Sequence, residues 1–555
     1  MSELFSSVNR SSVLKKMEQD RFDVLIIGGG ITGAGIALDA ASRGMKTALI
    51  EMQDFAAGTS SRSTKLIHGG LRYLKNLELM LVAEVGRERK VVFENGPHVT
   101  TPLKMLIPVY KNTGFGMFTT SMGLRLYDFL ARVEKNERYL MLSKEEIVQL
   151  EPKLNKDGLL GGGMFVEYRS DDARLTIEVL KEAVNQGATI INYAKVTDFI
   201  YQNGILAGAS IQDQLDGHRF EIQAKKTVNA AGPWVDSLRE KDHSLLDKQM
   251  YLTKGIHLVF DQSVFPLQPA IYFDTPDGRM VLMIPRNGKT YVGTTDTPYK
   301  GDLIQPQMTV KDRDYLLDTI HYIFPDLNLQ KCDVESSWAG VRPLIHEANK
   351  GPSDISRKDE IWTSASGLVS IAGGKLTGYR KMAEKVVDML AHSFQKEAGV
   401  MFLPCQTKQL PISGGEVGGS QQFPAFIEGK IDLGLKLGLN KNTAYSLIRQ
   451  YGSNIDDLYE IIERNHSASN TFGLPLGLYA QVIYSITKEC TCTPVDFFLR
   501  RTGALLFHIE SVKKWQESVI DLMSYKLGWD SEITESYRFE LQKQLQIQTT
   551  ALETD

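Results

Sequence analysis

The sequence predicts an α/β fold with a parallel βαβ unit, a second sheet that is mixed or antiparallel, and an all-α C-terminal domain. Three observations support it. Between Phe22 and Ile50 a short apolar strand, a glycine turn, a helix and a second strand follow one another, as in a βαβ unit. Residues 255–295 contain short strands separated by proline and glycine, which indicates a second sheet. After about residue 400 the pattern is mostly helical.

Periodicity and turn residues place further elements along the chain. Helices are expected over 77–95, 173–185 and 376–394, because each range carries apolar residues at helical spacing. Alternating residues predict strands over 190–195, 205–212 and 219–228, and two more strands within 361–371.

The composition fits a large protein that has no nucleic-acid partner. The chain has 555 residues and a net charge of −4. At roughly 150 residues per domain, this length allows two to four domains. The charge lacks the basic excess that binding to a phosphate backbone would require. The four cysteines indicate neither a disulfide framework nor a zinc site, so no metal is expected.

The N-terminus does not have the pattern of a secretory signal. Its first 21 residues are polar and lack an apolar stretch of ~7–15 residues. No segment approaches ~18 uninterrupted apolar residues. We therefore expect a cytoplasmic protein, either in solution or peripheral on the inner face of the cell membrane. A weak apolar face near the N-terminus is expected to pack against the protein rather than enter lipid; it consists of Leu4, Phe5, Val8, Leu14 and Met17.

The glycine turn has the spacing of a dinucleotide-binding motif. Gly28, Gly30 and Gly33 satisfy G-x-G-x-x-G between a strand and a helix, which is the context that the motif requires. In such a Rossmann-type unit the helix N-terminus stabilises a pyrophosphate. Glu51 ends the second strand, where a carboxylate accepts hydrogen bonds from a ribose. The motif predicts a dinucleotide without a ribose phosphate, and it leaves NAD and FAD as alternatives.

The residues after Glu51 favour FAD. Asp54 to Leu74 form a loop dense in hydroxyl groups and glycines, which is longer than an ordinary connector. With this loop, the sequence resembles the FAD-dependent glycerol-3-phosphate dehydrogenase family. The resemblance covers nearly the whole chain, in segments 60–74, 171–174, 229–234, 254–257, 293–296, 340–343, 373–377, 451–454 and 500–503.

The resemblance implies a fold like that of D-amino-acid oxidase. An FAD-binding domain, mainly 20–100, 165–240 and 355–395, is interleaved with a substrate domain, mainly 100–165 and 245–350. A helical domain spans 401–555. The resemblance also implies non-covalent FAD, sn-glycerol 3-phosphate as substrate, and a quinone acceptor reached at the inner membrane surface. It leaves room for a homodimer.

The cofactor-binding residues expected on this basis come from four places in the chain. The first is the glycine motif with its acid. The others are the loop after it, a strand end near 230 and a second glycine turn near 374. The full set is Gly28, Gly30, Gly33, Glu51, Thr59, Ser60, Ser61, Lys65, Leu66, His68, Gly69, Ala231, Gly232, Gly374, Lys375, Leu376 and Thr377.

Substrate oxidation requires an anion clamp and a proton acceptor. Arg342 and Arg357 are expected to hold the phosphate, because the planar guanidinium suits bidentate contacts. His257 is the candidate base, since imidazole has the side-chain pKa nearest to neutral pH. The alternative interpretations are surface ion pairs for the two arginines and a hydrogen-bonded core residue for the histidine.

The remaining candidates rest mainly on the resemblance. Arg72, Tyr73 and Lys375 match residues that line the family's substrate pocket, and Lys375 is a further catalytic candidate beside the flavin. Asp296 is expected to orient His257 or a substrate hydroxyl, unless it only caps a turn. Three other functions remain open: an oxygen-using glycerophosphate oxidase, an amine oxidase of the same fold, and a non-catalytic flavoprotein.

Overall fold

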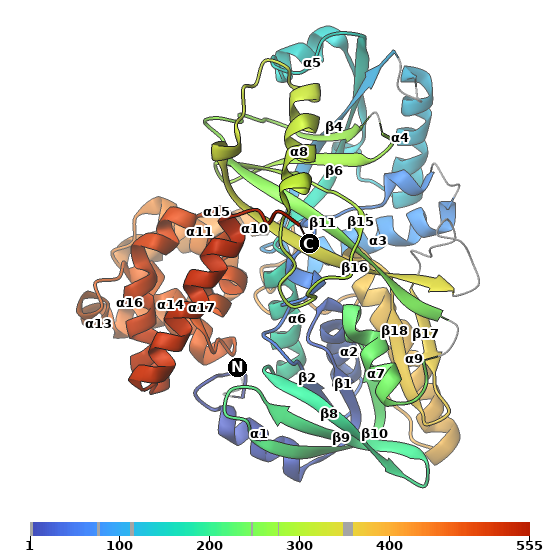
Figure 1. Cartoon of the computed structure of the whole chain (residues 1–555), viewed down its shortest axis with the longest axis vertical. Helices are drawn as coiled ribbons and strands as arrows, with labels where there is room; N and C mark the ends of the chain where they lie inside the picture. Colours follow the sequence, from blue (N-terminus) through green and yellow to red (C-terminus); the bar gives the residue numbers. More distant parts are fainter. Residues whose placement is uncertain are drawn as a thin grey trace.

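A computed structural model describes residues 4–74, 78–111, 116–245, 248–275, 277–347 and 359–554. Two sheets lie one above the other in the view of Figure 1, and the C-terminal helices, coloured red, lie to one side of them. Among the described residues, no helix has the length and apolar character needed to cross a membrane.

The first sheet contains the predicted βαβ unit. Its strand order is β17-β18-β10-β1-β2-β7, and β8 and β9 extend it from β10. The central pairs β18–β10, β10–β1, β1–β2 and β2–β7 are parallel. The strands are β1 (Arg21–Ile27), β2 (Thr47–Ile50), β7 (Thr189–Ile191), β8 (Ala194–Gln202), β9 (Ile205–Asp213), β10 (Arg219–Asn229), β17 (Glu360–Thr363) and β18 (Leu368–Ala372).

Three helices pack together beside this sheet: α2 (Ile31–Ser42), α6 (Asp172–Asn185) and α9 (Tyr379–Ala398). Small residues of α2 allow the close approach, since a Cβ on Gly35 would lie 2.9 Å from the Tyr379 ring. The N-terminal α1 (Arg10–Gln19) packs against β7 and β10. Of the apolar residues expected to pack against the protein, Phe5 and Met17 are buried, Leu4 and Leu14 are half-buried, and Val8 is exposed.

The second sheet follows the order β15-β11-β14-β13-β12-β4-β6-β3, with β16 on β11 and β5 on β6. Most of its pairs are antiparallel, as predicted. The strands are β3 (Leu66–Ile67), β4 (Thr100–Tyr110), β5 (Leu140–Ser143), β6 (Leu159–Ser170), β11 (Lys248–Asp261), β12 (Ala270–Asp274), β13 (Met280–Arg286), β14 (Lys289–Gly293), β15 (Thr297–Pro298) and β16 (Val334–Glu347).

The helices associated with the second sheet are α3 (Leu79–Asn95), α4 (Met117–Ala131), α5 (Lys144–Leu150) and α8 (Val310–Ile323). A short helix, α7 (Val235–Lys241), follows β10 in the first. The strand β3 joins this second sheet, and β6 runs past residue 165. Segments of the chain therefore pass between the two sheets at other positions than the expected domain limits. Those limits remain a prediction.

The C-terminal region is helical, and the predicted fold class is confirmed. Its helices are α10 (Phe423–Lys436), α11 (Lys441–Tyr451), α12 (Ile455–Arg464), α13 (His466–Thr471), α14 (Leu476–Lys488), α15 (Ala504–Phe507), α16 (Ile509–Leu527) and α17 (Ser531–Thr549), with a π-helical turn at Asp496–Arg501. The tail then returns to the second sheet region, where Leu552 exchanges backbone hydrogen bonds with Met308 and Val310.

Buried ion pairs join the helical region to the first sheet region. Asp54 accepts hydrogen bonds from Arg500 at 2.5 Å and from Arg501 at 2.7 and 2.9 Å. A second cluster joins Arg174 of α6 to Glu489 through both guanidinium nitrogens. All five side chains are almost fully buried. Although burial opposes ionisation, the charges of Arg501 and Arg500 hold the pKa of Asp54 below its usual value.

Candidate active site

A cavity of about 800 Å³ extends between the two sheet regions. From the first region it is lined by the glycine turn, Glu51 and the end of β10. From the second region it is lined by His257 on β11, Arg342 on β16 and Phe165 on β6. The volume falls within the range of small-molecule and cofactor sites.

The glycine turn fits a dinucleotide. Gly28 has a φ of 118°, and a Cβ there would lie 2.4 Å from the carbonyl oxygen of Ala230. A Cβ on Gly33 would lie 1.9 Å from the Gly28 carbonyl oxygen, so only glycine allows α2 to approach the strand this closely. Gly30 caps α2 and lines the cavity. A pyrophosphate placed here would meet the positive end of the helix.

Glu51 follows the last residue of β2 and lines the cavity. Its carboxylate accepts hydrogen bonds from the backbone N–H of Gly29 at 2.7 Å and of Gln53 at 2.8 Å. Burial raises the pKa of Glu51, while these two hydrogen bonds oppose the rise. The carboxylate has further acceptor capacity, so it can also bind ribose hydroxyls.

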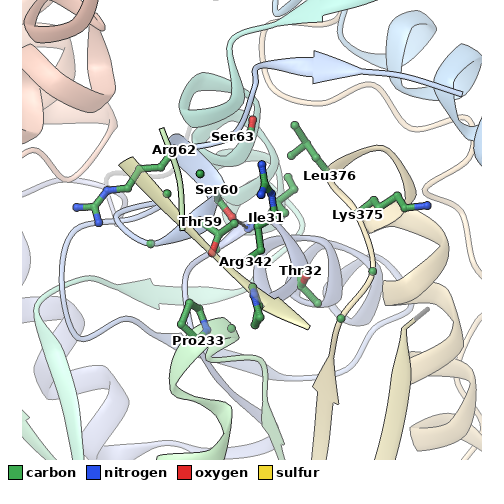
Figure 2. A pocket seen from close by; sticks show the side chains of 18 of the residues that line it. Ile31, Thr32, Thr59, Ser60, Arg62, Ser63, Pro233, Arg342, Lys375 and Leu376 are labelled. Carbon is green, nitrogen blue, oxygen red and sulfur yellow. Dashed lines mark hydrogen bonds between the residues drawn. The ribbon is translucent and has the colours of Figure 1, made fainter. Parts of the chain in front are cut away.

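Some residues of the hydroxyl-rich loop line the cavity, and others hold the loop in place. Thr59, Ser60 and Leu66 line the cavity, and Ser60 Oγ accepts from the N–H of Ile31 at 2.9 Å. This bond ties the loop to the first turn of α2 (Figure 2). Lys65 instead donates to Asp172 at 2.6 Å and to the carbonyl of Ser61 at 2.8 Å. The Lys65 side chain thus supports the loop, and the expected contact of Lys65 with the cofactor stays a prediction.

His257 is fixed within an aromatic and hydroxyl environment. Its ring stacks on Trp338 with centroids 4.5 Å apart, and its Nε2 lies 3.0 Å from Thr64 Oγ1. Burial, and then the charges of Arg342 and Lys65, lower the pKa of His257 well below its usual value. The imidazole is therefore in its neutral form at neutral pH.

Arg342 provides a positive charge in the part of the cavity where the substrate phosphate is expected to bind. It donates to Asp296 Oδ1 at 3.1 Å, to the Thr295 carbonyl at 3.2 Å and to Thr294 Oγ1 at 3.1 Å. Asp296 thus pairs with Arg342, whereas His257 is oriented by Thr64. The expected role of Asp296, orienting His257 or a substrate hydroxyl, stays a prediction, and Asp296 lines the cavity. Arg342 remains one-third exposed, which leaves room for an anion beside it.

The second glycine turn closes the cavity from the end of β18. Gly374, Lys375 and Leu376 line it, together with Ala231 and Gly232 from the end of β10. In Figure 2, Lys375 lies on the opposite side of the pocket from Arg62, with Arg342, Thr59 and Ser60 between them. Of the other cofactor candidates, His68 lines the cavity. The Thr377 side chain forms hydrogen bonds with the backbone of His68, and the Gly69 N–H donates to Glu167.

The side chains of three candidates lie outside the described part of the structure. Arg72 and Tyr73 belong to a short helical turn, Leu71–Leu74, whose neighbour Leu71 lines the cavity, but their side chains are not described. Arg357 lies wholly within the undescribed segment 348–358. Their substrate contacts stay predictions, as do the roles of the residues placed above.

The structure adds site residues that the sequence did not indicate. Arg62 lines the cavity and donates to the carbonyl of Ile304 at 2.9 Å. Burial, followed by the charge of Arg500, lowers the pKa of Arg62 to about 10, so this side chain remains a cation. Glu167 lines the cavity and accepts from Tyr127 at 2.6 Å and Arg89 at 2.9 Å. Its two partners lie 40 and 78 positions away, and no local motif connects them.

Comparisons with known proteins agree with this geometry. Residues 23–380 match the family described as FAD dependent oxidoreductase, and residues 405–534 match the C-terminal domain of alpha-glycerophosphate oxidase. The chain is 57% identical to the aerobic glycerol-3-phosphate dehydrogenase of Bacillus subtilis over 553 residues, which cover 100% of both chains. It is 54% identical to the enzyme of the same name from Staphylococcus haemolyticus, covering 98% of this chain and 97% of that one.

Solved structures give the same result. The structure of glycerol-3-phosphate dehydrogenase from Bacillus halodurans, complexed with FAD, has a TM-score of 0.87 and 46% identity, and the match covers 99% of this chain and 100% of that one. The L-alpha-glycerophosphate oxidase of Mycoplasma pneumoniae, with FAD bound, has a TM-score of 0.55 at 19% identity, covering 70% of this chain and 97% of that one. The second likeness shows the shared fold alone.

Proposed function

The chain belongs to the family of aerobic, FAD-dependent glycerol-3-phosphate dehydrogenases, and we propose that it oxidises sn-glycerol 3-phosphate to dihydroxyacetone phosphate. One observation carries this proposal. The dinucleotide turn at Gly28 and Gly30 and the side chains of His257 and Arg342 line a single cavity. Cofactor and substrate would therefore meet without an intervening wall.

The chemistry divides between the cofactor and the chain. When bound, FAD supplies the acceptor for the two electrons and the hydrogen that leave the alcohol carbon. The chain has to hold the phosphate and fix the alcohol beside the flavin. Arg342 supports the first task, because its guanidinium offers paired N–H donors to the phosphate oxygens. Its contacts with Asp296 and Thr294 fix the orientation of that group.

Proton removal is assigned to His257. The neutral imidazole is held by the Trp338 stack and by Thr64, and it lines the same cavity as Arg342. A buried neutral base accepts the hydroxyl proton as the carbonyl forms. The resulting imidazolium is disfavoured by burial and by the charge of Arg342, so it would lose the proton readily once the product leaves.

The electron acceptor and the assembly belong to the same proposal. We assign a quinone as acceptor and the inner membrane surface as the place where it is met. Non-covalent FAD agrees with a site built from backbone turns, hydroxyl groups and Glu51. A homodimer is compatible with this function.

Anaerobic flavin reduction tests the proposed function. Addition of sn-glycerol 3-phosphate to the purified holoenzyme should bleach the oxidised-flavin band, whereas glycerol and amino acids should leave it unchanged. A flavin that is not reduced by this substrate would contradict the proposal. Reduction by an amino acid would favour an amine oxidase instead.

A His257→Gln variant separates proton removal from binding. We expect the rate of flavin bleaching to fall by about a hundredfold, the lower end of the range for general base catalysis. The substrate concentration that gives half the maximal rate should change little. An unchanged rate would remove His257 from the reaction.

A further inference from the structure

We propose that the hydroxyl group of Thr64 carries the proton of the substrate alcohol to His257, so that the two side chains act as a relay. The inference rests on the proposed function and deepens it, because it names a further catalytic residue for the same reaction. The sequence did not single out Thr64 as a site residue.

The ring of His257 is held in one orientation by the second sheet. His257 on β11 lies opposite Gly293 of β14 on one side and opposite Trp338 of β16 on the other. Its ring stacks on Trp338 with the centroids 4.5 Å apart and the planes at 9°. A Cβ on Gly293 would lie 2.1 Å from His257 Cδ2, so the ring fills the space over that glycine. Each nitrogen of the ring therefore faces a fixed environment.

The two ring nitrogens of His257 differ in their surroundings. Nδ1 is enclosed, and among the described residues it has no hydrogen-bond partner. Nε2 lies 3.0 Å from Thr64 Oγ1. Because a proton from the substrate does not reach an enclosed nitrogen directly, it enters the ring at Nε2, the nitrogen that contacts Thr64.

The Thr64 hydroxyl is placed to contact both His257 and a substrate. Thr64 is half-buried and lines the same cavity as His257 and Arg342. Within the described ranges, its hydroxyl forms a hydrogen bond with His257 alone. A hydroxyl group donates one hydrogen bond and has two acceptor lone pairs. It can therefore donate to Nε2 and at the same time accept from the substrate alcohol.

Two aromatic side chains hold the backbone at Thr64 in place. Tyr291 Oη donates to the carbonyl oxygen of Thr64 at 3.1 Å, and Trp338 Nε1 donates to that of Ser63 at 3.1 Å. Trp338 thus contacts both the His257 ring and the backbone that precedes Thr64. The hydroxyl and Nε2 are therefore aligned before a substrate binds, and such alignment lowers the barrier to transfer.

The relay moves the proton in two linked transfers. The O–H bond of the alcohol breaks as a new O–H bond forms on Thr64 Oγ1, while the original O–H bond of Thr64 breaks and an N–H bond forms on His257 Nε2. Thr64 ends as a neutral hydroxyl, and His257 ends as an imidazolium. The hydrogen and the two electrons that leave the alcohol carbon go to the flavin, as in the proposed function. The relay requires a resting His257 that carries its proton on Nδ1, so that Nε2 is the acceptor.

Flavin bleaching by the holoenzyme tests the relay. Thr64→Val keeps the shape of the side chain but removes the hydroxyl, so the bleaching rate at saturating sn-glycerol 3-phosphate should fall by about a hundredfold. Thr64→Ser keeps the hydroxyl and should recover most of that rate. The substrate concentration that gives half the maximal rate should change little in both variants. A Thr64→Val variant that bleaches at the wild-type rate would overturn the proposal, because His257 would then take the proton directly.

Combination with His257→Gln distinguishes a relay from a change in the position of the loop. Because both residues serve one proton transfer, Thr64→Val/His257→Gln should be no slower than His257→Gln alone. Losses that multiply would overturn the relay. The matched control is Thr319→Val on α8, which removes a threonine hydroxyl that donates to the Tyr315 carbonyl at 2.9 Å, and it should bleach like the wild type.

The 15N resonances of the His257 ring, assigned by comparison with His257→Gln, test the contact without turnover. In the wild-type holoenzyme they should show a proton on Nδ1 and an Nε2 that accepts a hydrogen bond, and this bond should be lost in Thr64→Val. A proton on Nε2 in the resting wild type would overturn the proposal. The measurement uses no substrate, so it judges the relay contact separately if sn-glycerol 3-phosphate fails to reduce the flavin and the proposed function falls.

Discussion

The cavity and the junction with the C-terminal helices both contain charged side chains, but these differ in their partners and in their exposure. At the junction, Asp54 receives hydrogen bonds from two arginines and from Asn192, so its acceptor sites are filled. In the cavity, Arg342 pairs with Asp296, and its side chain remains one-third exposed. The junction compensates its charges within the protein, whereas the cavity keeps a cation accessible.

This difference separates structural charges from functional ones. A buried ion pair that is complete has no capacity left for a ligand, and removing one partner leaves an uncompensated charge. An arginine whose side chain is partly exposed can exchange part of its solvation for a bound anion. Substitutions at the junction should therefore change stability, and substitutions in the cavity should change reaction with the substrate.

The largest effect is expected from Asp54→Ala. This substitution leaves the guanidinium groups of Arg500 and Arg501 buried beside each other, and we expect a loss of about 4 kcal/mol in the free energy of unfolding. The measurement is the midpoint of urea unfolding of the holoenzyme. The control, Asp456→Ala, breaks the exposed pair with Lys430 and should cost less than about 1 kcal/mol. Equal effects of the two substitutions would abolish the distinction between junction and surface.

The next effect concerns the cavity. We expect Arg342→Ala to lower the kcat/KM for sn-glycerol 3-phosphate by at least about a hundredfold, because a charge-assisted contact with the phosphate is lost. Arg342→Lys should recover part of the activity, since lysine retains the charge but not the planar fork. Unfolding in urea should be nearly unchanged.

Two further variants sharpen this prediction. The removal of Arg342 leaves the Asp296 carboxylate facing the phosphate, so Arg342→Ala/Asp296→Asn should be more active than Arg342→Ala alone. Arg313→Ala, which breaks a pair with Asp314 on α8, should leave kcat/KM unchanged. A similar loss in both arginine variants would point to a general effect of charge rather than to a phosphate site.

The sequence predicted the parts of this comparison that depend on local patterns. The glycine turn, Glu51 and the strands of the βαβ unit follow from spacing and periodicity, and the structure contains them. The pairing of side chains could not be predicted in the same way. His257 stacks on Trp338 because the two residues face each other in the register of β11 and β16, and that register is set by the whole sheet.

Lys65 shows the same limit within a recognised motif. The resemblance to known flavoproteins marked it as a cofactor residue, but its ammonium group is paired with Asp172, 107 positions along the chain. The pairing of Asp296 with Arg342 could not be predicted either, since only the folded turn brings the two side chains together. Motifs identify where a site is, whereas tertiary contacts decide which side chains face the ligand.

The pH dependence of the free energy of unfolding gives a further test of the junction, because His98 lies near its charged groups Arg174 and Lys181. Burial, and then the charges of Arg174 and Lys181, lower the pKa of His98 to about 3, while the unfolded chain binds this proton near pH 6.5. The stabilising contribution is therefore complete above pH 6.5 and is lost as the pH falls from there towards 3. At pH 5 the loss should be about 2 kcal/mol. Urea unfolding of His98→Gln should depend less steeply on pH over this range, and an equal slope would refute the assignment.

The smallest effect is expected at Glu51, which belongs to both kinds of region. Its carboxylate is buried and bonded to the N–H groups of Gly29 and Gln53, like a junction charge, yet it lines the cavity like a functional one. Glu51→Gln keeps the shape but replaces a charged acceptor by a neutral amide, so a ribose would be held about tenfold more weakly, or ~1.4 kcal/mol. The measurement is the dissociation constant for FAD, obtained by titrating the apoprotein. Glu221→Gln, an exposed residue of β10 outside the cavity, serves as the control. If Glu51→Gln lowers the stability of the apoprotein but leaves FAD affinity unchanged, Glu51 serves only to support the turn and belongs with the charges of the junction.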